Sequence, residues 1–328
     1  MIVRFDRLAA ELPPPSTPDP DGASVVQELM GGKFGELSTF MNYTFQSFNF
    51  RDRQKARPFY DLIANIAAEE FGHIEVVAAT INSMLTGVST SSNEPDPTDR
   101  PLEGAQSFRN TRQWISGGLA ALPQNSNGDP WTGEFVNATG DLVQDLVHNY
   151  FLESGARREK LRVYEAVDHP AARALTGYLL VRGGVHQVAY ARALENLTGA
   201  DMSKLFPSPR IPTEKIPECR PFLATGEDTK LYRFSPTDYH ELAAVFNGNH
   251  PENGKPLVVE DVPPHGFPPN DLPAQTAVTA PDWNPDDIAE ISQRLREAAG
   301  LPSKATGEVT PVPDGMFKGL VAKVTPGG

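Results

Sequence analysis

The chain of 328 residues is long enough for one large domain or two modest ones, and its net charge is −13. This acidic balance argues against nucleic acids and anionic membrane surfaces as partners, because both attract basic protein surfaces. The single cysteine, Cys219, cannot form a disulfide within the chain, and we find neither a signal peptide nor an apolar run long enough to span a membrane. We therefore expect a soluble, cytoplasmic protein.

Prolines, glycines and apolar periodicity divide the chain into segments. Residues 1–20 include Pro13-Pro14-Pro15, which excludes a helix and predicts an N-terminal arm. Apolar side chains then recur at three- and four-residue spacing in four long stretches, which predicts four helices. These helices are expected at residues 21–50, 57–86, 132–167 and 170–198. A polar linker at 87–104 and a short helix within 105–121 are expected to connect the second helix to the third.

The composition changes after Gly199, and more than half of the 31 prolines lie beyond it. Residues 201–328 are therefore expected to form a long, Pro-rich and mostly irregular tail that wraps the bundle or a neighbouring subunit. Within this tail we expect a short strand at 257–259 and a final helix at 285–299. The predicted fold has an all-α core, a ferritin-like four-helix bundle at 21–200, between the arm and the tail.

Five polar residues fall on the inward faces of these helices. Glu70 and His73 lie three residues apart on the apolar stripe of the second helix, where an unpaired charge would be costly. Glu-x-x-His is the pair that dimetal carboxylate sites use in bundle cores. The same periodicity points Glu36, Glu153 and His186 inward from the other three helices. Three carboxylates and two imidazoles suit manganese or iron.

Each of these residues has an ordinary explanation when it is taken alone. Glu36 could be a solvated surface glutamate, and His186 could be a hydrogen-bonded core histidine. Glu153 could pair with Lys160 or Arg157 on its own helix. A coincidence of all five on four helices is a weaker explanation than one shared metal site.

Other polar residues fit a site less well. Glu69 and Glu75 flank the Glu-x-x-His pair but are predicted to point elsewhere, and His148 lies one position off the row of Glu153. Arg182 lies on the inward row of the fourth helix, one turn before His186. We find no Gly-x-Ser-x-Gly motif and no Walker-type phosphate loop in the sequence.

Several long, ordered blocks resemble the manganese (non-haem) catalases, and the resemblance covers about residues 1–250. The blocks are Gly32-Lys33-Phe34-Gly35-Glu36, Met41-Asn42-Tyr43, Gln46-Ser47-Phe48-Asn49-Phe50-Arg51, Tyr60-Asp61-Leu62-Ile63-Ala64-Asn65-Ile66-Ala67, Glu69-Glu70-Phe71-Gly72-His73-Ile74-Glu75, His148-Asn149-Tyr150-Phe151-Leu152-Glu153, Gly177-Tyr178-Leu179-Leu180-Val181-Arg182-Gly183-Gly184-Val185-His186 and Leu231-Tyr232-Arg233-Phe234-Ser235-Pro236.

The resemblance implies that the ligands of two manganese ions are the same five residues that helical spacing selects. It implies that Glu70 bridges both ions, with Glu36 and His73 on one ion and Glu153 and His186 on the other.

The resemblance also suggests which residues handle protons. Tyr43 and Lys160 match positions around the ligands in the family, so with Glu36 they are the candidate catalytic residues. Two positions depart from some family members. Gly183 stands where those proteins have a glutamate, and Leu152 stands where they have an arginine before the third glutamate ligand. Lys160 is therefore the better candidate for proton handling here.

The function that the resemblance implies is the disproportionation of two H2O2 to O2 and two H2O. A ping-pong cycle between Mn(II)2 and Mn(III)2 would carry it out, in a homohexamer. A calcium site seen in some members would include Asp61, although Asn65 replaces a carboxylate there. The alternatives are a di-iron oxidase or ferroxidase of ferritin-like type and a non-catalytic metal-storage shell protein. Manganese and iron accept the same ligands, so the ligand set alone leaves these open.

Overall fold

The computed structural model describes residues 7–15, 17–87, 110–205, 208–272 and 285–300. It divides into two compact units, residues 1–276 and residues 277–328. The helices and strands of the first unit are α1 (Pro20–Gly31), α2 (Glu36–Phe48), α3 (Arg57–Thr86), α4 (Thr111–Ile115), α5 (Leu142–Ala166), α6 (Pro170–Thr198), α7 (Arg220–Ala224), β1 (Lys230–Tyr232), α8 (Leu242–Val245) and β2 (Val258–Glu260). The second unit contains α9 (Pro285–Ala298).

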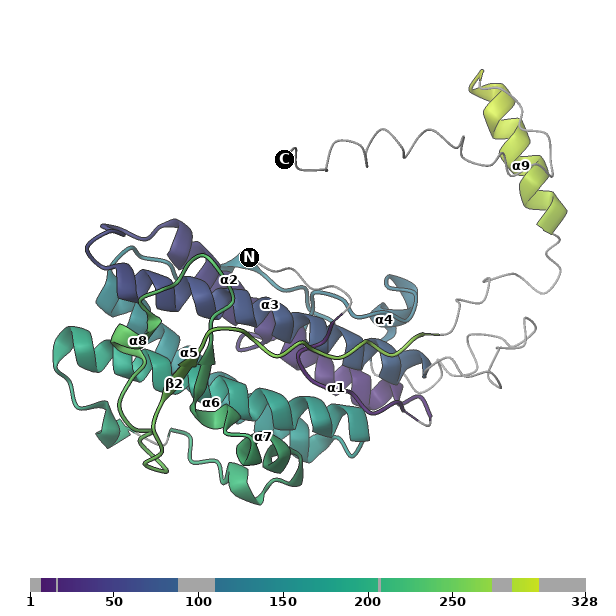
Figure 1. Ribbon diagram of the computed structural model, residues 1–328. Coiled ribbons are helices and arrows are strands. Elements are labelled where there is room, and N and C mark those ends of the chain that lie inside the picture. Colours follow the sequence, from purple (N-terminus) through teal and green to yellow (C-terminus); the bar gives the residue numbers. More distant parts are fainter. Residues whose placement is uncertain (1–6, 16, 88–109, 206–207, 273–284, 301–328) are drawn as a thin grey trace, which may run out of the picture. The chain divides into compact units, whose positions relative to one another are not determined.

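The first unit is built around a four-helix bundle of the ferritin-like kind, as predicted. The pair α1 and α2 packs along α3, α5 packs against α6, and α3 joins the two halves through α6. Figure 1 shows the long helices α3, α5 and α6 running beside one another. Among the described residues, no helix is both long enough and apolar enough to cross a membrane.

The prediction of one continuous helix over residues 21–50 is wrong, because the chain breaks between α1 and α2. A Cβ atom on Gly31 would lie 2.5 Å from the carbonyl oxygen of Gln124, so the connection that follows α4 presses directly on the end of α1. Gly32 then turns to extended backbone (ψ 166°), and Gly35 caps α2 with ψ 171°. The break makes Glu36 the first residue of α2, where the positive end of the helix dipole favours a carboxylate.

Two of the four predicted helices begin and end where the sequence indicates. The helix predicted at 57–86 is α3, and the helix predicted at 170–198 is α6. Pro170 occupies the first turn of α6, where its missing N–H is no loss. Gly199 ends α6 in the left-handed region (φ 72°), which glycine adopts without strain.

The third long helix is shorter than the predicted 132–167, because α5 begins at Leu142. Gly140, at φ 77°, turns the chain, and the Asp141 carboxylate accepts a hydrogen bond from the backbone N–H of Gln144 at 3.0 Å. This side-chain cap fixes the start of the helix. The preceding segment contains a short 3-10 helix, Gly133–Phe135.

The apolar core of the bundle is divided into two clusters along its length. One cluster takes its α3 residues from Leu62 to Ala67, and the other takes them from Val76 to Leu85. On α6, Leu179 belongs to the second cluster and Val185 to the first, and Leu180 and Val181 between them belong to a third cluster with Ile211, Ile216 and Cys219. The predicted metal ligands of α3 lie between the two groups of apolar residues on that helix, so the buried polar residues occupy the space between the first two apolar clusters.

The arm and the first part of the predicted tail lie against the bundle. Leu8 and Leu12 are buried in the second apolar cluster, and Leu8 forms an antiparallel bridge with Phe267. The strand predicted at 257–259 is β2, which pairs in parallel with β1 in the register Leu231 to Val259. The assignment of residues 201–328 to a separate tail stays a prediction.

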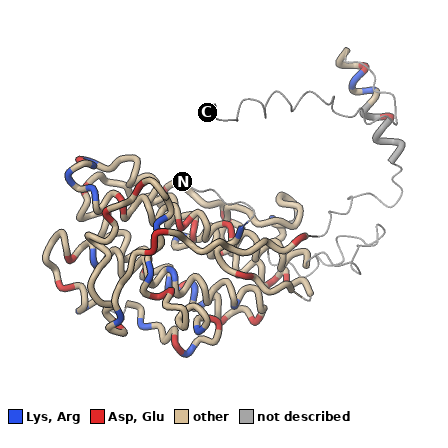
Figure 2. Tube along the Cα trace, in the orientation of Figure 1, with Lys and Arg blue, Asp and Glu red and all other residues tan. Residues whose placement is uncertain are grey.

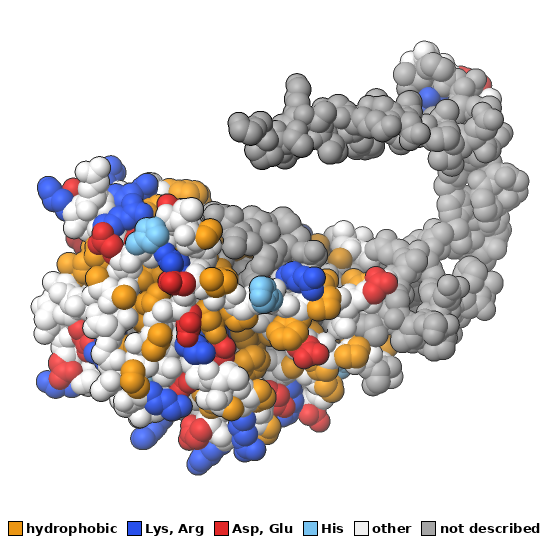
Figure 3. All heavy atoms as spheres, viewed as in Figure 1, with side chains coloured by type: hydrophobic (Ala, Val, Ile, Leu, Met, Phe, Trp, Pro, Cys, Tyr) orange, Lys and Arg blue, Asp and Glu red, His pale blue; other side chains and the backbone are white. Residues whose placement is uncertain are grey.

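The remaining predicted elements are short or fall partly outside the described residues. Within 105–121 the structure forms α4, and the helix predicted at 285–299 is α9. The linker predicted at 87–104 lies outside the described residues beyond Gly87. Over the part of the chain drawn in colour, acidic and basic residues are interspersed along the trace (Figure 2). On the face shown in Figure 3 they are mixed with hydrophobic side chains.

Candidate metal centre

The five residues predicted as ligands come from four helices and are all removed from solvent. Glu36 begins α2, Glu70 and His73 lie near the middle of α3, Glu153 lies on α5 and His186 lies on α6. None of the five is more than 1% exposed. Placing three carboxylates and two imidazoles in a bundle interior is costly unless their charges are balanced.

The carboxylate of Glu70 lies between the two imidazoles. Its Oε1 atom is 2.7 Å from Nδ1 of His186, and its Oε2 atom is 3.1 Å from Nδ1 of His73. The two imidazole rings stack with their centroids 5.4 Å apart. One ligand atom from each of these three residues lies within 4.8 Å of the other two, which is a spacing that a metal ion can fill. The Thr39 hydroxyl donates a hydrogen bond to Glu70 Oε2 at 2.9 Å and holds the carboxylate in this orientation.

The other two glutamates approach one imidazole each. Glu36 Oε2 lies 3.3 Å from Nδ1 of His73, and Glu153 Oε1 lies 3.5 Å from Nδ1 of His186. The cluster therefore consists of two groups that share Glu70. Each group contains one further carboxylate, one oxygen of Glu70 and one Nδ1 atom.

Lys160 contacts the carboxylate of Glu36, and Tyr43 contacts the carboxylate of Glu153. The Lys160 ammonium group lies 2.9 Å from Glu36 Oε1, and the Tyr43 hydroxyl donates a hydrogen bond to Glu153 Oε1 at 2.7 Å. Both side chains are buried, Lys160 at 1% and Tyr43 at 0% exposure. The two candidate proton carriers are thus in direct contact with the candidate ligands.

Gly183 leaves room for Lys160. A Cβ atom at this position would lie 3.2 Å from the Lys160 ammonium nitrogen and 3.5 Å from Glu153 Oε2. A glutamate at position 183 would compete with Lys160 for this space. At the second departure from the family pattern, Leu152 is 5% exposed and belongs to the first apolar cluster.

The prediction that Glu69 points away from the site is wrong. Glu69 is 2% exposed, and its Oε2 atom lies 3.1 Å from Nε2 of His186 while its Oε1 atom lies 3.8 Å from Nε2 of His73. Arg182 approaches the same carboxylate, with its Nε donating to Glu69 Oε1 at 2.6 Å. Glu69 therefore contacts both imidazoles on the side opposite Glu70.

The error over Glu69 comes from treating α3 as a helix with one buried face. This helix packs against α1 and α2 as well as α6, so more than one of its faces is buried. Glu69 also precedes His73 by four residues, a spacing that places both on one side of a helix. The signal that could have found it is Arg182, because an inward-facing arginine on α6 requires a buried carboxylate nearby.

The charges of the cluster shift its protonation equilibria strongly. Burial acts to lower the pKa of His73, but the carboxylates of Glu70 and Glu36 outweigh it and raise that pKa to about 9. The pKa of His186 is likewise raised, because Glu69 and Glu70 outweigh its burial, and both histidines lower the pKa of Glu70 despite its burial. The two imidazoles thus attract positive charge, which protons or metal ions can supply in competition.

Several buried atoms of the cluster lack hydrogen bonds that would satisfy them. Within the described residues, Glu153 Oε2 has no hydrogen-bond partner. Glu36 and Nδ1 of His186 make only the close charged contacts described above and no hydrogen bond. Buried polar atoms of this kind are uncommon in proteins and point to a missing partner. Because the metal-ligating atoms are carboxylate oxygens and imidazole nitrogens, they fit a divalent ion such as manganese or iron.

The residues predicted for calcium are engaged with other partners. Asp61 is fully buried, and its Oδ1 atom pairs with Nε of Arg57 at 2.6 Å. The Asn65 side chain donates to the carbonyl of Tyr232 and accepts from the backbone N–H of Phe234, both at 2.8 Å. Asn65 thus helps to hold the segment around β1 against α3.

The fold and the cluster together define a class of protein, a four-helix bundle with a buried carboxylate–histidine cluster of the kind that can hold metal ions. The family profile described as manganese containing catalase matches residues 1–301. The chain belongs to the manganese catalase family.

Two relatives and one solved structure are similar to the chain. A manganese catalase of Bacillus subtilis is 34% identical over 183 residues, which cover 56% of this chain and 66% of that protein. A protein of Clostridium acetobutylicum named "Probable manganese catalase" is 31% identical over 188 residues, covering 57% of this chain and 76% of that protein. The crystal structure of KatB, a manganese catalase from Anabaena PCC7120, aligns with a TM-score of 0.49 at 20% identity, covering 80% of this chain and all of that one. The chain thus spans just under two thirds of the length of the Bacillus subtilis manganese catalase.

Proposed function

We propose that this chain is a catalase that converts hydrogen peroxide to O2 and water at a centre of two manganese ions. The observation that carries the proposal is the position of Glu70, whose two oxygens each face a different imidazole across 2.7 and 3.1 Å. A carboxylate in this position can bridge two ions. The family membership of the chain supports manganese as the metal.

The two groups of the cluster suggest which residues hold each ion. Glu36, His73 and Oε2 of Glu70 would hold one ion, and Glu153, His186 and Oε1 of Glu70 would hold the other. Each ion would then have three protein ligands, which leaves coordination positions for solvent or substrate. When bound, the two ions supply a two-electron couple between Mn(II)2 and Mn(III)2, which two peroxide molecules would use in turn in a ping-pong cycle.

The overall reaction, two H2O2 giving O2 and two H2O, moves two electrons and two protons from one peroxide to the other. The chain must therefore hold two protons between the half-reactions, and side chains next to the ligands are suited to do so. Lys160 is in contact with Glu36, and burial raises the pKa of Glu36 although Lys160 opposes the shift. The Tyr43 hydroxyl is hydrogen-bonded to Glu153. We propose Glu36, Lys160 and Tyr43 as the groups that store and return protons.

Glu69 has a positioning role in this proposal. Its carboxylate faces Nε2 of both histidines, so it favours the tautomer in which Nε2 carries hydrogen and Nδ1 is free to bind metal. Arg182 neutralises Glu69 and fixes its orientation. The five ligands together with Glu69 and Arg182 form the site that we propose.

The test is elemental analysis of the purified protein together with an oxygen-electrode assay. We expect about two manganese ions per chain and O2 release at half the rate of peroxide loss. Glu70→Ala should abolish both, and Glu195→Gln, a change near the end of α6 where the carboxylate pairs with Arg192 at 2.6 Å, should abolish neither. Iron in place of manganese with no O2 release would favour a di-iron oxidase, and metal uptake without peroxide loss would favour a storage protein.

Two further expectations from the family remain to be measured. A homohexamer predicts six chains by light scattering, and a calcium ion at Asp61 would have to compete with Arg57, which already occupies its carboxylate.

A further inference from the structure

A second cavity, separate from the manganese ligands, opens between α5, α6 and the segments that follow α6. Its volume is about 970 Å³, and its walls include Arg157 of α5, Gly184 of α6, residues 210–215 and residues 250–255. None of the five proposed manganese ligands lines it. This volume admits a phosphate or a small carboxylate together with water molecules.

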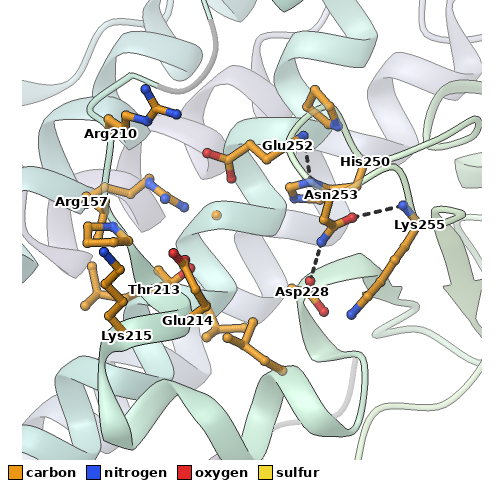
Figure 4. A pocket seen from close by; sticks show the side chains of 17 residues that line it. Arg157, Arg210, Thr213, Glu214, Lys215, Asp228, His250, Glu252, Asn253 and Lys255 are labelled. Atoms are coloured by element: carbon orange, nitrogen blue, oxygen red, sulfur yellow. Dashed lines mark hydrogen bonds between the residues drawn. The ribbon is translucent and has the colours of Figure 1, made fainter.

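Arg157 is the unusual residue of this cavity. It is only 5% exposed, and its buried Nε atom has no hydrogen-bond partner in the described part of the chain. Figure 4 shows its side chain extending into the cavity, with Glu252 and Asn253 on the opposite wall. An arginine cannot escape its charge by losing a proton in a protein, so a buried guanidinium nitrogen without a partner indicates that a partner is missing.

The guanidinium of Arg157 packs against the backbone of α6 at Gly184. A Cβ atom on Gly184 would lie 2.3 Å from Nη1 of Arg157, so only a bare glycine allows the guanidinium to lie against the helix here. Burial lowers the pKa of Arg157, and Glu252 and Glu153 oppose that change from a distance. The planar donor fork thus lies against α6 at the wall of the cavity.

The charges around the cavity favour an anion. Four cationic side chains line it, those of Arg157, Arg210, Lys215 and Lys255, against three carboxylates, those of Glu214, Asp228 and Glu252. Asp228 is partly engaged, because it accepts a hydrogen bond from Asn253. The lining therefore carries a small positive balance in a chain whose net charge is −13.

We propose that this cavity binds a small oxyanion of the phosphate or carboxylate class, with Arg157 as its principal ligand. A guanidinium donates two parallel N–H bonds to two oxygens of such an anion, which an ammonium cannot do. Arg210, Lys215 and Lys255 add attraction at the walls. The site is independent of the manganese centre, although Arg157 follows Glu153 by one helical turn.

The experiment is calorimetric titration of the manganese-loaded, full-length protein with inorganic phosphate, and separately with acetate. We expect saturable binding of one anion per chain. Arg157→Gln should weaken it by about tenfold or more, since a hydrogen-bonded charge is lost. The control is Arg158→Gln, an exposed arginine next to it in sequence, which should leave the affinity unchanged.

Three outcomes would overturn the proposal. The first is the absence of saturable binding by wild-type protein, which would also be the result if a carboxylate of a second copy filled the cavity. The second is undiminished binding by Arg157→Gln, which would place the anion elsewhere, at the metal ions for example. The third is equal binding by Arg157→Lys and wild type, which would contradict recognition by the guanidinium fork. This variant also serves as the test if Arg157→Gln fails to fold.

Discussion

Replacing Glu69 by glutamine tests whether the residue behind the two histidines controls metal binding. The Glu69 carboxylate has two oxygens and uses both, Oε1 with Arg182 at 2.6 Å and Oε2 with His186 Nε2 at 3.1 Å. Glutamine has the same shape but only one oxygen. If that oxygen accepts from Arg182, the amide NH2 group faces the Nε2–H of His186, and two donors meet.

The size of the effect follows from burial and from the contacts that remain. Glu69 and Arg182 are 2% and 1% exposed, and removing one partner of a buried ion pair costs about 3–5 kcal/mol. Arg182 keeps hydrogen bonds to the carbonyls of Glu227 and Lys230, each at 2.8 Å, so we expect the lower end, about 3 kcal/mol. Loss of a group that orients a metal-bound histidine typically weakens metal binding about 10–100-fold.

The assay is competition for manganese against a chelator, with free Mn²⁺ read by electron paramagnetic resonance, alongside denaturant unfolding of the metal-free protein. Glu227→Gln is the matched control. Its carboxylate lies 3.7 Å from Nη1 of Arg182 but contacts neither histidine. We expect it to reduce stability slightly and to leave manganese affinity unchanged. Unchanged affinity in Glu69→Gln, or an equal loss in Glu227→Gln, would refute the positioning role.

Three further changes test residues of α5 and α6. Lys160→Met removes the cation beside Glu36 Oε1 and leaves that carboxylate with His73 alone. Denaturant unfolding of the metal-free protein should therefore show a loss of about 3 kcal/mol, and O2 release per manganese should fall about 100-fold. A variant as active as wild type would exclude Lys160 from proton handling. Gly183→Ala places a Cβ atom 3.2 Å from Lys160 Nζ, so catalase activity should fall. The melting temperature should hold or rise, because alanine favours a helix over glycine by about 1 kcal/mol. Unchanged activity would contradict crowding of Lys160 by the new methyl group. Burial, aided by Glu28, raises the pKa of Glu159 to about 7 from its ordinary 4.5. The native state therefore binds this proton more tightly than the unfolded chain, and stability should fall as pH rises from 4.5 to about 7. Glu159→Gln should raise stability by an amount on the order of 1 kcal/mol at pH 8, a figure reduced because the residue is partly exposed, and should not change it at pH 4.

The sequence predicted the parts of the fold that local signals determine. Helices α3 and α6 carry strong periodicity and end at glycines, so their bounds could be read directly. The five polar residues could be selected because each interrupts an apolar stripe, and the structure brings all five together.

The parts that were missed depend on contacts between distant segments. The break before Glu36 arises where the chain around Gln124 presses on Gly31, which no local pattern encodes. The orientation of Glu69 depends on how many faces of α3 its neighbours bury. The cavity beside Arg157 is formed by residues of α5, α6 and the segments between residues 210 and 255, so no single sequence motif predicts it.

The central claim is that Glu70 bridges two manganese ions, and anomalous X-ray diffraction at the manganese absorption edge tests it most directly. We predict two anomalous peaks per chain, one between Glu70 Oε2 and His73 and the other between Glu70 Oε1 and His186. A single peak, or no peak within bonding distance of Glu70, would contradict the account.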